Sequence, residues 1–285
     1  MSTKTDLHDS KMNYIEELGK DLISFLHSIP SQYNKQGLLV CLSGGVDSAL
    51  NLKLCAQAVG KERVLAVIME VPSLNKQEDM AEAQAWAQEL GVPFVRLDLT
   101  HFFNALHQTF PFLDEHAQKI TLNRLRLSIA YTYADRFGYS IVSSGNYSEE
   151  VTRPIVLHGS GSGDCFPYTS LYKTEIYALA KHFQLPQKIL DKAPSDGFIG
   201  NYTDMDSIGD VRYSDVDKIL HALVNQQYKA DQATDPLAIH LATLHSKFSR
   251  QLDFPTFIAK ETQQRTKFIQ TSNEFPYERT TNPTC

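Results

Sequence analysis

The sequence predicts an α/β fold, a doubly wound parallel sheet flanked by helices. Short apolar runs of strand type alternate with longer segments at helical spacing over the first part of the chain. The 285 residues are 42% hydrophobic and 21% charged, which suits a globular protein with a large core. Strands that alternate with helices need crossover connections, which produce a parallel sheet covered on both faces. Ligands are therefore expected beyond the carboxyl ends of the strands.

The chain opens with a helix and the first strand-to-helix unit. Apolar residues between positions 12 and 29 lie near one helical face, and Pro30 is expected to end this helix. Residues 37–42 form a short apolar run that predicts the first buried strand. A helix is expected over residues 47–60, because its apolar spacing is helical and it closes on a glycine.

Two more strands and a long helix continue the alternation. Residues 63–71 and 94–99 are strand-like, and residues 77–92 between them are rich in good helix formers. A long helix is expected over residues 121–139, and a fourth strand over residues 140–146. The polar ends of the first and fourth strands should therefore meet at one edge of the sheet.

After residue 150 the alternation becomes less regular. A Gly/Ser-rich loop, a helix, an acidic loop and a second helix are predicted, over residues 151–170, 171–183, 185–210 and 213–224. An irregular tail follows from about residue 231 to residue 285. We expect one domain over residues 1–285, with the N-terminal helix and this tail as its appendages.

Charge, hydropathy and cysteine usage limit the class of protein. The formal charge of −6 disfavours a nucleic-acid binder. The first residues lack the apolar core of a signal peptide, and no run approaches the ~20 apolar residues that span a bilayer. A cytoplasmic protein with no membrane partner is therefore expected. The cysteines form no CxxC pair and no metal-ligand spacing with histidine, which indicates reduced thiols at Cys41, Cys55, Cys165 and Cys285.

The turn after the first strand carries the sequence SGGVDS, from Ser43 to Ser48. It lacks the lysine of a Walker A loop, and its adjacent glycines do not fit the Gly-x-Gly-x-x-Gly dinucleotide pattern. Small residues let the backbone approach a pyrophosphate, serine hydroxyls can donate to its oxygens, and Asp47 can hold a bridging Mg²⁺. The structural alternative is a tight turn with an acidic helix cap.

This turn resembles the pyrophosphate loop of the PP-loop ATP pyrophosphatase superfamily, whose members cleave ATP between the α- and β-phosphates. The resemblance implies an adenine nucleotide alpha hydrolase-like fold. It also implies that the whole turn binds ATP, through Ser43, Gly44, Gly45, Val46, Asp47 and Ser48.

Further segments resemble, in order and spacing, the body of ammonia-dependent NAD synthetases. They are RLRLSIAYTYA, SSGNYSEE, GSGSGDCFP, SLYKTEIYALAKHFQLPQKILDKAPSDG and YSDVDKIL, and with the turn they cover residues 38–220. The resemblance implies that ATP adenylates the carboxylate of deamido-NAD, and that ammonia displaces AMP to give NAD. It further implies a homodimer that binds the acid substrate partly across its interface. We expect no fused glutaminase domain, so free ammonia or a separate partner would supply the nitrogen.

The same resemblance implies a set of ATP and metal residues. Asp47 and Glu149 fall at the family's Mg²⁺ positions, and Lys173 falls where a lysine meets the phosphates. Ser144 replaces the usual threonine near ATP, and Ser195 again replaces a threonine. A lysine and a metal near a leaving pyrophosphate would stabilise the charge that spreads in the transition state.

Two further residues are implied on the acid-substrate side. Arg124 and Asp164 fall where the family faces this substrate, and Asp164 joins Asp47 and Lys173 as an implied catalytic residue. Structural alternatives remain for each. Arg124 would otherwise be a helix-surface charge, and Asp164 would form an Asx-turn. Lys173 would be a solvated residue in the first turn of a helix, and Glu149 a cap.

Several positions depart from the family pattern. Leu157 and Ser160 stand where a lysine and an aspartate are usual, and Ser143-Ser144 replaces a Gly-Thr pair. Phe248-Ser249 stands where a basic pair is usual. The residues implied to bind ATP match the family pattern better than those implied to bind the acid substrate, so two hypotheses remain. The chain is a divergent NAD synthetase, or a paralogue that adenylates and amidates another carboxylate.

Two other functional classes fit less well. A non-catalytic nucleotide-binding homologue has little need for the two-carboxylate metal site of Asp47 and Glu149. A sulfur-inserting tRNA enzyme of the same superfamily needs a reactive thiol and a basic RNA surface, whereas Cys41 is expected to be buried and the net charge is negative. His158, beside the Gly/Ser loop, is either a site residue or a solvated loop histidine.

Overall fold

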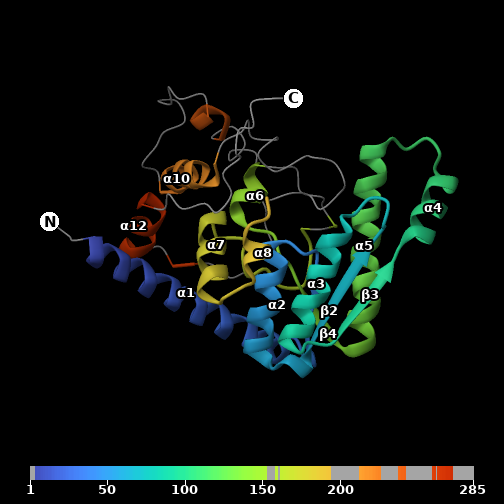
Figure 1. The fold of residues 1–285 in the computed structure, drawn as a ribbon, viewed down its shortest axis with the longest axis horizontal. Helices are drawn as coiled ribbons and strands as arrows, with labels where there is room; N and C mark the ends of the chain where they lie inside the picture. The colour runs from blue at the N-terminus through green and yellow to red at the C-terminus, as the bar shows by residue number, and fades with distance from the viewer. Residues whose placement is uncertain are drawn as a thin grey trace.

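The structure is a computed structural model (Figure 1). It describes residues 4–152, 158–159, 161–193, 212–225, 237–241, 259–260 and 262–271.

Within the described residues, four parallel strands form the sheet in the order β3-β2-β1-β4. They are β1 (Gly37–Cys41), β2 (Val64–Glu70), β3 (Phe94–Asp98) and β4 (Tyr139–Val142). The register pairs Val40 of β1 with Ala66 of β2 and with Val142 of β4. All of β2 is buried, as expected for a strand with a helical layer on each face. The predicted doubly wound parallel sheet is confirmed.

Helices cover both faces of the sheet (Figure 1). One face packs against α1 (Lys4–Gln32), α2 (Val46–Val59) and α3 (Gln77–Leu90), the other against α4 (Thr100–Thr109) and α5 (Glu115–Phe137). The side chains of β1 alternate between the two cores, with Leu38 and Val40 in the first and Leu39 in the second. Because β1 is central and buried on both faces, the turn that follows it starts from a rigid base.

The second half of the chain adds shorter helices to the first layer. They are α6 (Tyr147–Thr152), α7 (Lys173–His182), α8 (Gln187–Leu190), α10 (Tyr213–Val224) and α12 (Gln263–Thr271), with a helical stretch at 237–241. Ile176 of α7 and Val216 of α10 share the core of α1 and α2. Phe268 of α12 packs on α1, with its ring 5.5 Å from that of Tyr14. A short 3₁₀ turn, η1 (Lys61–Arg63), precedes β2.

The predicted end of the first helix at Pro30 is wrong. α1 begins at Lys4 and continues through Pro30 to Gln32. A proline so close to the end of a helix removes a single backbone N–H bond, and the neighbouring bond from Tyr33 N to Ile29 O still forms at 3.1 Å. The helix therefore ends two residues later than expected, at Gln32.

Among the described residues, the short helices α4, α6 and α8 were not predicted, and α8 lies inside the predicted loop over residues 185–210. α4 starts immediately after β3, where Asp98 Oδ1 accepts from the backbone N–H of Thr100 at 2.8 Å. The fourth strand ends at Val142, earlier than predicted, and a loop over residues 143–146 leads into α6. This loop and α6 carry polar residues to the carboxyl edge of the sheet.

Only part of the predicted tail lies within the described residues. There, 237–241 and α12 are helical. In the portions of the chain that are described, no helix combines the length and apolar character needed to cross a bilayer.

Candidate functional site

The turn between β1 and α2 requires glycine at position 44. Gly44 has φ of +84°, and a Cβ there would lie 2.5 Å from the carbonyl oxygen of Asp79 in α3. Gly45 follows as the residue before α2, with an extended backbone. The first backbone N–H groups of a helix lack partners within the helix and point beyond its start. The turn therefore has the geometry of an anion site.

The hydroxyls of the turn bond to one another. Ser48 Oγ donates to Gly45 O at 3.1 Å and accepts from the backbone N–H of Ser43 at 3.2 Å. Ser43 Oγ lies 3.1 Å from Ser48 Oγ. Ser48 is buried and Ser43 is exposed, so Ser48 shapes the turn from inside while Ser43 lies at its surface.

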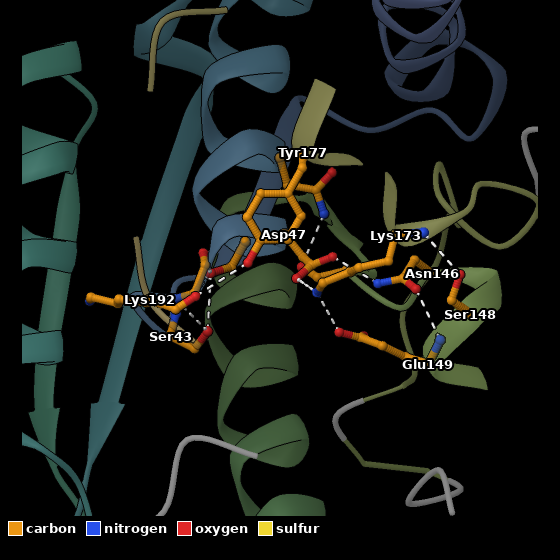
Figure 2. Close-up of polar contacts among 12 residues, drawn as sticks. Ser43, Asp47, Asn146, Ser148, Glu149, Lys173, Tyr177 and Lys192 are labelled. Carbon is orange, nitrogen blue, oxygen red and sulfur yellow. Dashed lines mark hydrogen bonds and ion pairs between the residues drawn. The ribbon is translucent and has the colours of Figure 1, made fainter. Parts of the chain in front are cut away.

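Three side chains from three helices meet beside this turn (Figure 2). Lys173 Nζ, from the first residue of α7, lies 2.6 Å from Asp47 Oδ2 in α2 and 2.5 Å from Glu149 Oε1 in α6. The Lys173 side chain is 1% exposed, and those of Asp47 and Glu149 are 15% and 8% exposed. The structure thus brings together three residues that the sequence singled out, and their roles toward ATP and Mg²⁺ stay predictions. The solvated alternative for Lys173 is wrong, and so is a purely capping Glu149.

Among the described residues, two carboxylates of this cluster share one ammonium. Burial, followed by repulsion from Glu149, raises the pKa of Asp47, and Lys173 and Asn146 oppose this rise.

Asn146 is a site residue that sequence reasoning missed. Its Nδ2 donates to Asp47 Oδ1 at 2.8 Å, and its Oδ1 accepts from the backbone N–H of Glu149 at 3.0 Å. It therefore joins the two acids, as Figure 2 shows. Nothing in the segment SSGN distinguished this asparagine from a turn residue, although its place after a buried strand was a weak signal.

The loop after β4 is tied to α2 by a second asparagine. Asn51 Nδ2 donates to Ser143 O at 2.9 Å and to Ser144 Oγ at 3.0 Å. Ser144 therefore lies beside the α2 helix that carries Asp47, which is compatible with its predicted place near ATP. Its contact with ATP stays a prediction.

Lys192, just after α8, also contacts the turn and was not predicted. Its Nζ donates to Gly44 O at 3.1 Å, and it pairs with Asp79 and Glu82 of α3 at 2.8 and 2.6 Å. One lysine thus connects α8 and α3 to the carbonyl of Gly44, the glycine with a positive φ. No feature of the segment ILDKAPS indicated this role of Lys192.

Asp164 is engaged at a different junction. Its Oδ1 accepts from the Tyr131 hydroxyl at 2.9 Å, and its Oδ2 accepts from the backbone N–H of Ile141 at 2.7 Å. The carboxylate thus joins α5 to β4, and because both partners are distant in sequence the Asx-turn alternative is wrong. A catalytic role for Asp164 stays a prediction.

Arg124 and Arg126 differ in environment, although both lie on α5. Arg124 is exposed, whereas Arg126 is half-buried and donates to Asn75 Oδ1 at 3.0 Å. Burial lowers the pKa of Arg126 to about 10, so the guanidinium stays charged at neutral pH. Contact of Arg124 with the acid substrate stays a prediction.

Several predicted positions cannot be located in the structure. Ser195 and the divergent positions Leu157, Ser160 and Phe248-Ser249 lie outside the described residues. His158 is exposed, as its solvated alternative expects.

The described cysteines lack the properties of a reactive thiol. Burial raises the pKa of Cys41 to about 12, and it also raises the pKa of Cys55 and Cys165. Cys41 is partly rather than fully buried, which corrects the expectation for it. Sulfur transfer by any of these three residues is therefore disfavoured.

A parallel α/β sheet with a glycine turn after its central strand is typical of nucleotide-binding proteins of the doubly wound class. The family model for NAD synthase matches residues 18–250 of the sequence. The chain belongs to the NAD synthase family.

Curated relatives and solved structures agree with this assignment. The NH(3)-dependent NAD(+) synthetase of Methanococcoides burtonii is 35% identical over 66% of this chain and 72% of its own. That of Finegoldia magna is 32% identical over 85% of this chain and 98% of its own. The solved NMN synthetase of Francisella tularensis has a TM-score of 0.72 at 24% identity, covering 84% of this chain and 99% of its own. An NH3-dependent NAD synthetase of Campylobacter jejuni has a TM-score of 0.69 with the same identity and coverage. The adenine nucleotide alpha hydrolase-like fold is confirmed.

Proposed function

We propose that this protein is an ammonia-dependent NAD synthetase, which converts deamido-NAD, ATP and ammonia into NAD, AMP and pyrophosphate. The observation that carries the proposal is the buried Lys173, held between Asp47 of the glycine turn and Glu149. Membership of the NAD synthase family supports it. The relatives named NH(3)-dependent NAD(+) synthetase support ammonia as the nitrogen source.

The reaction needs no side-chain nucleophile, because the two bound substrates react with each other. A carboxylate oxygen of the acid attacks the α-phosphorus of ATP, and pyrophosphate leaves. Ammonia then attacks the carbonyl carbon of the acyl-adenylate, the bond to AMP breaks, and the nitrogen gives up one proton to water and keeps two as the amide. The protein contributes by binding ATP at the turn and by stabilising the charge that develops on the departing pyrophosphate.

Lys173 is the residue that we assign to this stabilisation. Its ammonium is nearly inaccessible to water, and an electrostatic interaction is stronger in such surroundings than in bulk water. The ring centroids of Tyr177 and Tyr213 lie 5.9 and 6.0 Å from Nζ, which limits where the ammonium can move. Ser43, Ser144, Ser195 and the backbone of residues 44–48 are proposed to contact the nucleotide.

The donor set fits a magnesium ion. Asp47 and Glu149 offer two carboxylates that share one ammonium, and Mg²⁺ in nucleotide enzymes is held by one or two carboxylates together with substrate phosphates. These two residues would hold the ion. When bound, Mg²⁺ would neutralise charge on the phosphate oxygens.

The acid substrate is proposed to lie toward α5, near Arg124 and Asp164. Arg124 is exposed on the outer side of this helix, where it is accessible to an anionic substrate. Asp164, through Tyr131 and Ile141, fixes α5 against β4. The second candidate, a ligase for another carboxylate, rests on the departures at Leu157 and Ser160 in the sequence.

We also propose a cytoplasmic homodimer that pairs through the α4 and α5 side of the molecule. Exposed aromatic side chains gather there, on α4 and just after it: Phe102, Phe110 and Phe112, which are 50%, 42% and 79% exposed. Exposed apolar groups of this size are typical of a surface that is covered in an assembly. Sedimentation of the purified chain at micromolar concentration tests the dimer, and a monomeric mass would contradict it.

An end-point assay tests the proposed reaction. Purified protein is incubated with ATP, Mg²⁺, ammonium and deamido-NAD, and NAD, AMP and pyrophosphate are quantified. Equal amounts of the three products are expected, with none when the acid is left out and no NAD when ammonium is left out. A parallel reaction replaces deamido-NAD with nicotinate mononucleotide, because the fold is shared with a solved NMN synthetase. Turnover with that acid alone would overturn the proposed substrate and favour the second candidate.

A further inference from the structure

Asp217 of α10 is a buried acid to which the proposed chemistry assigns no role. It is fully buried, and both carboxylate oxygens have partners on other helices. Oδ1 accepts from the Ser148 hydroxyl at 2.5 Å, and Oδ2 accepts from the backbone N–H of Thr174 at 2.9 Å. A buried carboxylate is costly to maintain, so its contacts call for an explanation.

These contacts lie at the start of α7. Lys173 and Thr174 are its first two residues, and such residues have no intrahelical acceptor for their N–H groups. Lys173 N donates to Ser148 Oγ at 2.9 Å, and Thr174 N donates to Asp217. A carboxylate from α10 thus caps α7 in the way that a local side chain usually does. Its negative charge also complements the helix dipole.

The same carboxylate also contacts α6, the helix that carries Glu149. Ser148 directly precedes Glu149 in α6, and its hydroxyl connects Asp217 to the backbone of Lys173 (Figure 2 shows this link from Ser148 to Lys173). Through Ser148 and Thr174, one acid therefore holds the backbones that present Glu149 and Lys173. A long lysine side chain reaches a reproducible position only when its backbone is fixed.

We infer that Asp217 is a positioning residue for adenylation. By holding the backbones of α6 and α7, it keeps Lys173 and Glu149 at the correct distance from Asp47 and the glycine turn. The inference rests on the proposed function, in which Lys173 stabilises the leaving pyrophosphate. A small displacement of a catalytic group costs transition-state stabilisation more than ground-state binding. Loss of Asp217 should therefore lower kcat and leave the KM for ATP nearly unchanged.

The decisive variant is Asp217→Asn, which keeps the size of the side chain but can accept with only one oxygen. We expect kcat for pyrophosphate release to fall about 10- to 100-fold, with the KM for ATP changing less than about threefold. Asp215→Asn is the matched control, because Asp215 lies on the same helix and pairs at the surface with Arg212 and Lys218. It should behave as the wild type.

A double-mutant cycle separates positioning from fold stability. If Asp217 acts through Lys173, Asp217→Asn should add little to the loss already caused by Lys173→Met in single-turnover pyrophosphate release. If Asp217→Asn lowers the single-turnover rate in the Lys173→Met protein as much as in the wild type, the inference is wrong. A wild-type kcat in Asp217→Asn would also overturn it. If Asp217→Asn folds poorly, Ser148→Ala can replace it, because it removes one of the two hydrogen bonds to Asp217. Ser148→Ala should lower kcat several-fold by itself and add little to the loss caused by Lys173→Met.

Hydrogen exchange gives a readout that does not depend on the acid substrate. The Thr174 amide should exchange faster in Asp217→Asn than in the wild type and in Asp215→Asn. If the Thr174 amide exchanges at the same rate in Asp217→Asn and in the wild type, the inference about Asp217 is wrong, whether or not the wild type forms NAD. If the wild type forms no NAD, that result by itself contradicts only the proposed function. If the wild type forms NAD and Asp217→Asn forms it at the same rate, only the inference about Asp217 is wrong.

Discussion

Lys173 and Asp47 are 126 positions apart in the chain, and their side chains meet at 2.6 Å. The contact joins the turn after β1 to the start of α7, which belongs to the less regular second half of the sequence. Glu149 completes it from the loop and helix after β4. Because β1 and β4 are parallel neighbours, their carboxyl ends bring α2 and α6 to the same edge. The site is thus a product of the strand order.

Replacement of Lys173 by methionine should affect catalysis and stability together. We expect kcat for pyrophosphate release to fall about 100- to 1,000-fold, because the developing charge loses its buried partner. The variant also leaves two buried carboxylates without their ammonium, which should lower the free energy of unfolding by about 3 kcal/mol. Urea unfolding with and without Mg²⁺ checks this.

Added Mg²⁺ should restore part of the lost stability in Lys173→Met, since a divalent cation can take up the charge of Asp47 and Glu149. The exposed Lys188 of α8 provides the control, and Lys188→Met should unfold like the wild type. A Lys173→Met protein with unchanged turnover would remove the main support for the proposed function.

Glu149→Gln should raise the Mg²⁺ concentration needed for half-maximal pyrophosphate release, by about tenfold. The amide keeps the size of the side chain and removes one of the two charges that we assign to the metal. Mn²⁺ binding, followed by electron paramagnetic resonance, gives a measure that is independent of turnover. Glu115→Gln, at a carboxylate that is 80% exposed on α5, should leave both measurements unchanged. Identical metal dependence in Glu149→Gln would count against the metal assignment.

The adjacent glycines of the turn should respond differently to alanine. Gly44→Ala places a Cβ 2.5 Å from Asp79 O at a φ of +84°, so we expect a loss of about 1–3 kcal/mol in unfolding free energy. Gly45 has φ of −84°, and the nearest atom to its Cβ is Ser43 Oγ at 3.5 Å. Gly45→Ala should therefore keep its stability and lose ATP affinity, because the methyl group lies where the backbone approaches phosphate.

Urea unfolding and ATP binding by calorimetry distinguish the two variants. Equal stability of Gly44→Ala and the wild type would mean that the turn does not have the conformation described above.

The fold was largely predictable, and the contacts between distant side chains were not. Each strand of the first half depends on local apolar spacing, so periodicity located β1 to β4 within a few residues, whereas α4 was missed. The glycine turn was also local, because it follows directly from a strand-to-helix junction. Asn146, Lys192 and Asp217 carry no such signal. Their partners depend on how α3, α6 and α7 pack, which no short stretch of sequence specifies.

Lys192→Met should weaken ATP binding rather than the chemical step. Lys192 holds the carbonyl of Gly44, and the loss of this bond frees the peptide that links Gly44 to Gly45. We expect the KM for ATP to rise about fivefold to tenfold with a smaller change in kcat, because one hydrogen bond to a charged donor is lost. Steady-state kinetics at saturating deamido-NAD measures both constants. A fall in kcat with unchanged KM would instead implicate Lys192 in the transition state.

The stability of the protein should fall as Asp217 ionises. Burial raises its pKa from 3.8 to about 7, although Ser148 and Thr174 donate hydrogen bonds that lower it. A carboxyl group that binds its proton more tightly in the folded state loses stability as pH rises from the unfolded pKa through the folded pKa. This loss is absent below about pH 4 and complete above about pH 7.

Asp217→Asn removes this titration. Between pH 5 and pH 8, the free energy of unfolding of the wild type should therefore fall by on the order of 2 kcal/mol relative to that of the variant. Urea unfolding of both proteins across this range measures the difference, and Asp215→Asn should keep the pH dependence of the wild type. Parallel curves for the wild type and Asp217→Asn would show that Asp217 keeps an ordinary pKa. Its two hydrogen bonds and the dipole of α7 would then outweigh the cost of burial.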